Sequence, residues 1–90
     1  MTMKKTEYFE NDVEKRPERF EARRPDWIAY VLAKPAWTEV EENGRIRHWR
    51  YILEIRQWLR VVTLADNETV HNVFLDRGFR LSRKRSRQTS

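Results

Sequence analysis

The feature that most constrains the fold is a change in hydrophobic periodicity at Pro35. On its N-terminal side, four apolar residues recur at helical spacing: Trp27, Ile28, Val31 and Leu32. From Trp37 onward, β-branched and aromatic residues alternate with polar ones at the two-residue period of a strand. One change from the first period to the second predicts an α+β fold, with short N-terminal helices followed by an antiparallel sheet.

Prolines delimit the predicted helices. Pro25 and Asp26 begin the clearest helix, because proline fits the first helical turn and a carboxylate suits its positive end. Pro35 ends this helix, since the residue before a proline is disfavoured in helical conformation. The segment 17–23 is predicted to be a shorter helix with a proline in its first turn. Residues 1–16 carry only a weak apolar pattern, so we expect a flexible N-terminal arm there.

Four stretches have the composition of strands: 37–42, 45–54, 58–65 and 69–76. Asn43-Gly44 predicts a type I′ hairpin, whose two central residues both need positive φ. Asp66-Asn67 is a weaker signal of the same kind, and the connection at 55–57 has no turn-forming residue. We therefore expect a four-stranded antiparallel β-meander with the short helices packed on one face.

Counting residues from these turns assigns the side chains to two faces of the sheet. One face, called the basic face below, is expected to carry Arg47, Trp49, Tyr51, Arg60, Val62, Leu64, His71, Val73 and Leu75, with Arg77 at its end. The other is expected to carry Ile46, His48, Arg50, Ile52, Leu59, Val61, Val70, Asn72 and Phe74. The helices should cover this second face, because its middle is nearly continuous apolar surface. A slip of one residue in register would exchange the faces.

Composition and charge restrict location and domain organisation. The chain has no cysteine, so disulfide staples are excluded and a reducing, cytoplasmic location is predicted. It carries neither a signal-peptide pattern nor an apolar run long enough to span a membrane. The segment 80–90 holds five basic residues and no acidic one, which accounts for the whole net charge of +5. We expect one α+β domain over 17–79 and a disordered basic tail over 80–90.

The basic face has the composition of a surface that holds single-stranded RNA. Arginines such as Arg47 bind phosphates, and rings such as Trp49 and Tyr51 stack on bases. The tail can add phosphate contacts through Arg83, Lys84 and Arg85. A structural interpretation stands beside this one: the rings cover the open side of a thin sheet, the arginines pair with nearby glutamates, and the tail serves solubility.

Metal-independent RNA cleavage is the catalytic hypothesis for the same face. His71 can act as acid or base near neutral pH, and Arg47, Arg60 and Arg77 can hold the phosphate. Tyr51 can orient the reacting groups or donate a proton. The alternative for His71 is a half-buried strand residue with no chemical role. No cofactor or metal is predicted, since the two histidines are too few for a metal site and the two glycines form no phosphate-binding loop.

Four runs also carry a family resemblance: Arg24-Pro25-Asp26-Trp27-Ile28, Asn43-Gly44-Arg45-Ile46-Arg47-His48-Trp49, Leu59-Arg60-Val61-Val62-Thr63-Leu64 and 69–79. Together they resemble small bacterial proteins whose layout is similar to the RelE/BrnT-type toxin superfamily. The resemblance implies helices before a four-stranded antiparallel sheet, an RNA-directed toxin-like function and an antitoxin-like protein partner. The alternative function is a non-catalytic protein-interaction module that uses a sheet edge or the aromatic face. No sequence feature specifies an oligomeric state.

Overall fold

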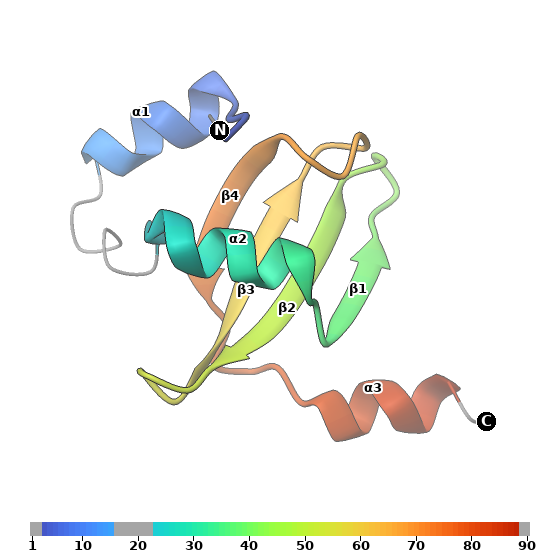
Figure 1. Ribbon diagram of the computed structural model, residues 1–90. Coiled ribbons are helices and arrows are strands. Elements are labelled where there is room, and N and C mark those ends of the chain that lie inside the picture. Colours follow the sequence, from blue (N-terminus) through green and yellow to red (C-terminus); the bar gives the residue numbers. More distant parts are fainter. Residues whose placement is uncertain (1–2, 16–22, 89–90) are drawn as a thin grey trace.

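The computed structural model describes residues 3–15 and 23–88 (Figure 1). Within them the chain forms α1 (Glu7–Lys15), α2 (Pro25–Ala33), β1 (Trp37–Val40), β2 (Ile46–Ile52), β3 (Gln57–Thr63), β4 (Val70–Leu75) and α3 (Leu81–Gln88). The strands form one antiparallel sheet in the order β1-β2-β3-β4. The predicted α+β fold, with short N-terminal helices packed on a four-stranded meander, is confirmed. No helix of the described residues is long and apolar enough to cross a bilayer.

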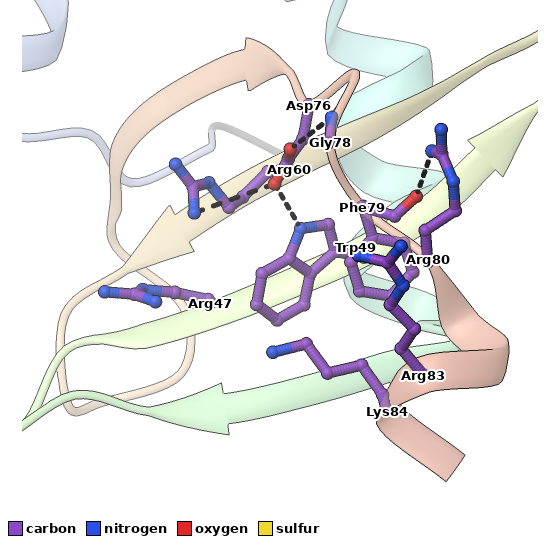
Figure 2. A pocket seen from close by; sticks show the side chains of 9 residues that line it. All are labelled: Arg47, Trp49, Arg60, Asp76, Gly78, Phe79, Arg80, Arg83 and Lys84. Carbon is purple, nitrogen blue, oxygen red and sulfur yellow. Dashed lines mark hydrogen bonds and ion pairs between the residues drawn. The ribbon is translucent and has the colours of Figure 1, made fainter. Parts of the chain in front are cut away.

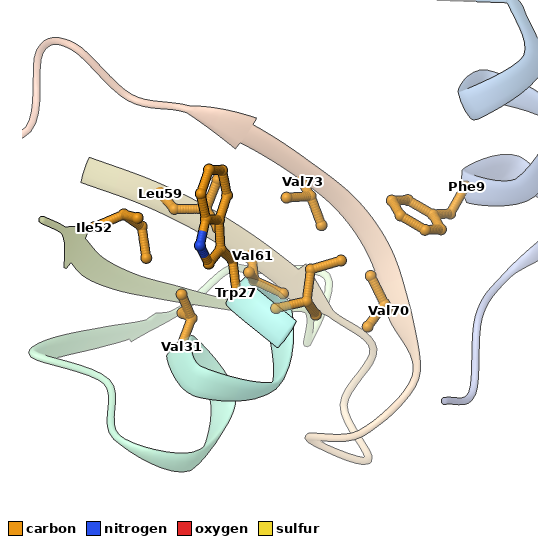
Figure 3. Packing of buried hydrophobic residues seen from close by; sticks show 9 residues of the cluster. Phe9, Trp27, Val31, Ile52, Leu59, Val61, Val70 and Val73 are labelled. Atoms are coloured by element: carbon orange, nitrogen blue, oxygen red, sulfur yellow. The ribbon is translucent and has the colours of Figure 1, made fainter. Parts of the chain in front are cut away.

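The hydrophobic core lies between α2 and the face of the sheet that it crosses (Figures 1 and 3). Helix α2 contributes three buried side chains at helical spacing: Trp27, Ile28 and Val31. The sheet contributes Ile52, Leu59, Val61 and Val73, and Phe9 of α1 extends the cluster over Val70. This confirms the helical stripe before Pro35 and the apolar face expected to receive it. Helix α2 does not cover the opposite face of the sheet, which is the basic face.

The three hairpin turns between β1 and β4 share one construction. Each is closed by a hydrogen bond from the N–H of its fourth residue to the carbonyl of its first: Gly44 to Glu41, Arg56 to Leu53, and Asn67 to Leu64. That fourth residue has positive φ in each turn, 89° at Gly44, 52° at Arg56 and 64° at Asn67. Asn43 does not have positive φ, so the predicted type I′ turn is wrong. The chain uses the longer loop type, a turn followed by one left-handed residue.

The predicted faces of β2 and β3 are confirmed. Trp49 lies opposite Arg60, and Arg47 lies opposite Val62, so these four residues project from the basic face. The middle turn comes at 53–56, earlier than the sequence suggested, but the shift is an even number of residues. An even shift moves the cross-strand partners and leaves each side chain on its face.

The faces of β4 differ from prediction because the strand contains a β-bulge. Val62 pairs with Asn72 and Thr63 pairs with Val70, which leaves His71 as the extra residue. One extra residue reverses the face of everything that follows it. Val73 and Leu75 were predicted on the basic face and instead lie on the helix-covered one, opposite Val61 and Leu59. Asn72 and Phe74 make the reverse exchange, opposite Val62 and Arg60.

The two ends of the described chain are more ordered than the sequence suggested. The expected flexible arm contains α1, and the segment before it adds a parallel bridge to the edge of β4 between Lys5 and Val70. The expected disordered tail contains α3, which leaves the sheet near the end of β4 (Figure 1). Both helices depend on tertiary contacts, because isolated helices this short are marginal in water. Of the helix predicted over 17–23, residues 17–22 lie outside the described part of the chain.

Candidate functional site

A central pocket lies on the basic face, where the chain passes from β4 into α3 (Figure 2). Its volume is about 320 Å³, and it is lined by Arg47, Trp49, Arg60, Asp76, Gly78, Phe79, Arg80, Arg83 and Lys84. Five of these described lining residues are cationic and only Asp76 is anionic. β2 and β3 supply Arg47 and Arg60 side by side, and α3 supplies Arg83 and Lys84 from the opposite wall (Figure 2). The pocket therefore concentrates positive charge from two elements.

Asp76 organises the floor of the central pocket. Its carboxylate accepts a hydrogen bond from the Trp49 indole Nε1 at 2.9 Å and one from the Gly78 backbone N–H at 3.2 Å. The Arg60 Nη1 lies 3.7 Å from the same carboxylate. One side chain at the end of β4 thus fixes a ring of β2, a guanidinium group of β3 and the turn that leads to α3.

Trp49 is a structural residue in this arrangement. It is only 2% exposed, and its ring stacks on Phe79 with centroids 4.9 Å apart. The Lys84 ammonium lies 5.7 Å from the same ring. The sequence predicted Trp49 as a surface on which bases stack, whereas in the structure other groups of the protein lie against its ring. The physical reason is that Phe79, in the connection between β4 and α3, packs on a ring that the sequence left open.

Arg60 lies deeper than the other cations of the pocket. Its guanidinium carbon is 4.1 Å from the centre of the Phe74 ring, and its buried Nε has no hydrogen-bond partner among the described residues. Burial lowers the pKa of Arg60, the nearby Asp76 carboxylate opposes that effect, and the positive charge of Arg47 adds to it. The ordinary pKa of arginine is so high that the side chain stays charged. Arg60 is a cation with unused donor capacity, next to a second cation.

Lys84 anchors α3 to the sheet. Its ammonium pairs with Glu39 of β1 at 2.6 Å. Burial alone would raise the pKa of Glu39, but hydrogen bonds from Lys84 and Trp37 outweigh it and hold the pKa below its ordinary value. The basic segment predicted to be a disordered phosphate-binding tail is therefore docked by one of its own lysines. Arg83 lines the central pocket, while Arg85 is exposed on α3 and does not.

A second pocket, called the His71 pocket below, adjoins the central one. Its volume is about 460 Å³, and it is lined by Tyr8, Glu41, Arg45, Arg47, Arg60, Val62, His71, Asn72 and Phe74. Arg47 and Arg60 line both pockets, so the two hollows form one basic surface across the sheet. The bulge in β4 places the consecutive residues His71 and Asn72 in this one pocket, which an unbroken strand would not do.

The surroundings of His71 favour the neutral form of its ring, because they lower its pKa. Burial lowers its pKa, the positive charge of Arg45 lowers it further, and Glu41 only partly opposes them. Its Nδ1 shares a hydrogen bond of 3.1 Å with the Thr6 hydroxyl, and its ring stacks on Tyr8. A neutral imidazole beside three arginines has the chemistry of a proton acceptor next to a phosphate.

The structure places the predicted catalytic residues in two different pockets. Arg60 and His71 line the same pocket, as the hypothesis requires. Arg77 is exposed and lines a third pocket, with Tyr51 and Trp58, at the far end of the basic face. Tyr51 itself is 39% exposed and meets Trp58 edge to face at 5.6 Å. Arg77 and Tyr51 therefore line a different pocket from His71. Of the other predicted residues, Arg47 and Arg60 line the His71 pocket.

Several residues of the site were not singled out from the sequence. Arg45 could have been found, because it continues the two-residue alternation from Arg47 toward the turn. Asp76 and Tyr8 had no local signal, since their roles depend on contacts with Trp49 and His71 far away in the chain. Among the described residues, no group of three or more histidine and carboxylate side chains could hold a metal ion.

Comparisons of the chain with protein-family models, curated proteins and solved structures found no match. The resemblance to the RelE/BrnT-type toxin superfamily therefore stays a prediction, as do the toxin-like function and the antitoxin-like partner that it implies. The arrangement of helices before a four-stranded antiparallel sheet, which the resemblance also implied, is present in the structure.

Proposed function

We propose that the protein binds single-stranded RNA through the basic face of its sheet. The observation that carries the proposal is the pair of adjoining pockets that share Arg47 and Arg60. Among their described lining residues, six are Lys or Arg (Arg45, Arg47, Arg60, Arg80, Arg83 and Lys84) and two are acidic (Glu41 and Asp76). This excess of positive charge lies along a surface that also carries aromatic rings. Such a surface suits a single-stranded nucleic acid, because the cations bind its phosphates and its unpaired bases can reach the rings.

The ion pairs already present do not neutralise this surface. Glu41 accepts from the Arg47 Nε at 2.9 Å, and Asp76 lies within ion-pair distance of Arg60. Both carboxylates are partly exposed, so each pair exchanges readily with solvent and contributes little stability. A phosphate can therefore replace a carboxylate as the partner of either arginine without leaving a buried charge unpaired.

The test compares arginines on opposite faces of β2. Arg47 lies on the basic face, and Arg50 lies on the other face, where its guanidinium group contacts Tyr30. Fluorescence anisotropy of a labelled single-stranded RNA, measured over a range of salt concentrations, gives the number of phosphate contacts. Arg47→Gln should weaken binding and reduce the salt slope by about 0.7, the value for one contact on a single strand. Arg50→Gln is the matched control and should match the wild type.

Contradicting results are equally specific. Equal losses in the two variants would show that binding follows net charge and not the basic face. If the wild-type protein shows no salt-dependent affinity for RNA, the proposal is wrong. The protein-interaction alternative would then gain support.

Metal-independent RNA cleavage is a second candidate, favoured by one observation. His71, whose pKa is lowered by burial and by Arg45, lines a pocket that also contains Arg45 and Arg60, so a base and cations for a phosphate are together. Cleavage of a bound RNA in the presence of a chelator, lost in His71→Asn and kept in Arg50→Gln, would support it. Binding without cleavage would leave RNA binding as the function, whereas cleavage unaffected by His71→Asn would remove His71 from the mechanism.

A further inference from the structure

An exposed aromatic ring of α1 lies in the His71 pocket. Tyr8 stacks on the His71 ring with centroids 4.8 Å apart and an angle of 21° between the planes. The tyrosine is nevertheless 52% exposed. One side of the ring therefore rests on protein, and a large part of it remains open to solvent. No sequence pattern singled Tyr8 out as a binding residue.

The stack is held in place from two sides. The Thr6 hydroxyl bonds to the His71 Nδ1 at 3.1 Å and accepts the backbone N–H of Phe9 at the same distance. Phe9, the next residue after Tyr8, is buried in the core. The first turn of α1 is thus tied both to the bulge of β4 and to the core. Tyr8 is presented by a fixed backbone, which lowers the entropy lost when a ligand packs on it.

The surroundings of the Tyr8 ring suit both the base and the phosphate of a nucleotide. Arg45, Arg47 and Arg60 line the same pocket as the Tyr8 ring, and the pocket volume of about 460 Å³ is in the range of small-ligand sites. Single-stranded nucleic acids are held by rings that stack on bases and by cations that follow the phosphates. Two other rings lie near these arginines, and both are occupied by protein groups. Phe79 stacks on Trp49, and the Arg60 guanidinium carbon lies 4.1 Å from the centre of the Phe74 ring.

We propose that the His71 pocket is a nucleobase subsite. One base of a bound single-stranded RNA stacks on the exposed side of Tyr8, and its phosphate lies against Arg45 and Arg47. The proposal rests on the proposed RNA binding and adds to it the place where a base, and not only the backbone, is held. Stacking of this kind accepts any base, so the subsite gives affinity for nucleotides without sequence preference.

The experiment separates the base from the backbone. Three ligands are titrated by calorimetry: a hexanucleotide RNA, an abasic oligomer with the same backbone, and inorganic polyphosphate. The variants are Tyr8→Leu, which removes the ring, and Tyr8→Phe, which keeps it. Tyr30→Leu is the matched control, because Tyr30 is also exposed (41%) and also contacts an arginine, Arg50, but lies on α2 outside these pockets.

The expected result is specific to Tyr8 and to the base-bearing ligand. Tyr8→Leu should lower the affinity for the hexanucleotide about tenfold, since one stacked base has that effect. Its affinity for polyphosphate and for the abasic oligomer should be unchanged. Tyr8→Phe and Tyr30→Leu should bind all three ligands like the wild type. In the wild type, a 2-aminopurine base in the hexanucleotide should lose fluorescence on binding, which reports stacking without any substitution.

Three results would overturn the subsite. Tyr8→Leu could bind the hexanucleotide as tightly as the wild type, or could lose polyphosphate affinity to the same extent. 2-Aminopurine could remain unquenched at every position of the bound hexanucleotide. Each of these leaves RNA binding by the arginines intact. A wild-type protein that binds neither RNA nor polyphosphate would instead overturn the proposed function itself.

Discussion

Replacing Asp76 by alanine should destabilise the protein strongly, although the side chain lies at the surface of a pocket. The Trp49 indole, 2% exposed, would lose its only hydrogen-bond acceptor among the described residues. A buried donor left unpaired costs about 2 kcal/mol. Loss of the partly exposed pair with Arg60 adds about 0.5 kcal/mol. The exposed N–H of Gly78 can bond to water instead, so its loss adds about 0.5 kcal/mol.

These contributions predict that Asp76→Ala lowers the free energy of unfolding by about 3 kcal/mol. For a chain of this length, the melting temperature should fall by about 15 °C. Asp76→Asn keeps an acceptor for the indole and should lose only about 1 kcal/mol. Urea denaturation followed by tryptophan fluorescence measures both. Asp26→Asn is the control, because Asp26 is exposed and bonds to its neighbour Arg24; it should stay within about 0.5 kcal/mol of the wild type.

Two results would refute this reasoning. A loss below about 1 kcal/mol in Asp76→Ala would show that the indole is not held by this carboxylate. Equal losses in Asp76→Ala and Asp76→Asn would show that charge, and not the hydrogen bond, matters. The same variants also test the site, since Asp76→Asn removes a negative charge from the central pocket and should raise RNA affinity at low salt.

Gly44→Ala should cost about 1 to 2 kcal/mol in urea denaturation. The φ of 89° alone causes the loss, since the added Cβ would lie 3.7 Å from the Ala65 Cβ, an ordinary contact; an unchanged midpoint would contradict this. Thermal stability should also fall with pH below about 6.5, because burial lowers the pKa of both His48 and His71 and the unfolded chain then takes up protons first. Melting temperatures measured at pH values down to about 5 should decline less in His71→Asn, and an equal decline would exclude His71 as a source.

The sequence determined the elements whose signals are local. Helix α2 follows from the helical spacing of Trp27 and Val31 between two prolines. The alternation of β2 and β3 placed Arg47 and Arg60 on one face, and an error in the middle turn did not change this, because the shift was even. The fold class and the two central cations of the candidate site were therefore predictable from the chain alone.

Only the tertiary structure decided the rest, because the deciding contacts join residues far apart in the sequence. The bulge at His71 has no local signal, yet it reverses the faces of β4 and brings His71 and Asn72 into one pocket. The Trp49 ring is contacted by Phe79 and Lys84, which reach it only when the connection after β4 and α3 pack back toward the sheet. Periodicity assigns a side chain to a face, but it cannot show whether a later segment of the chain will cover that face.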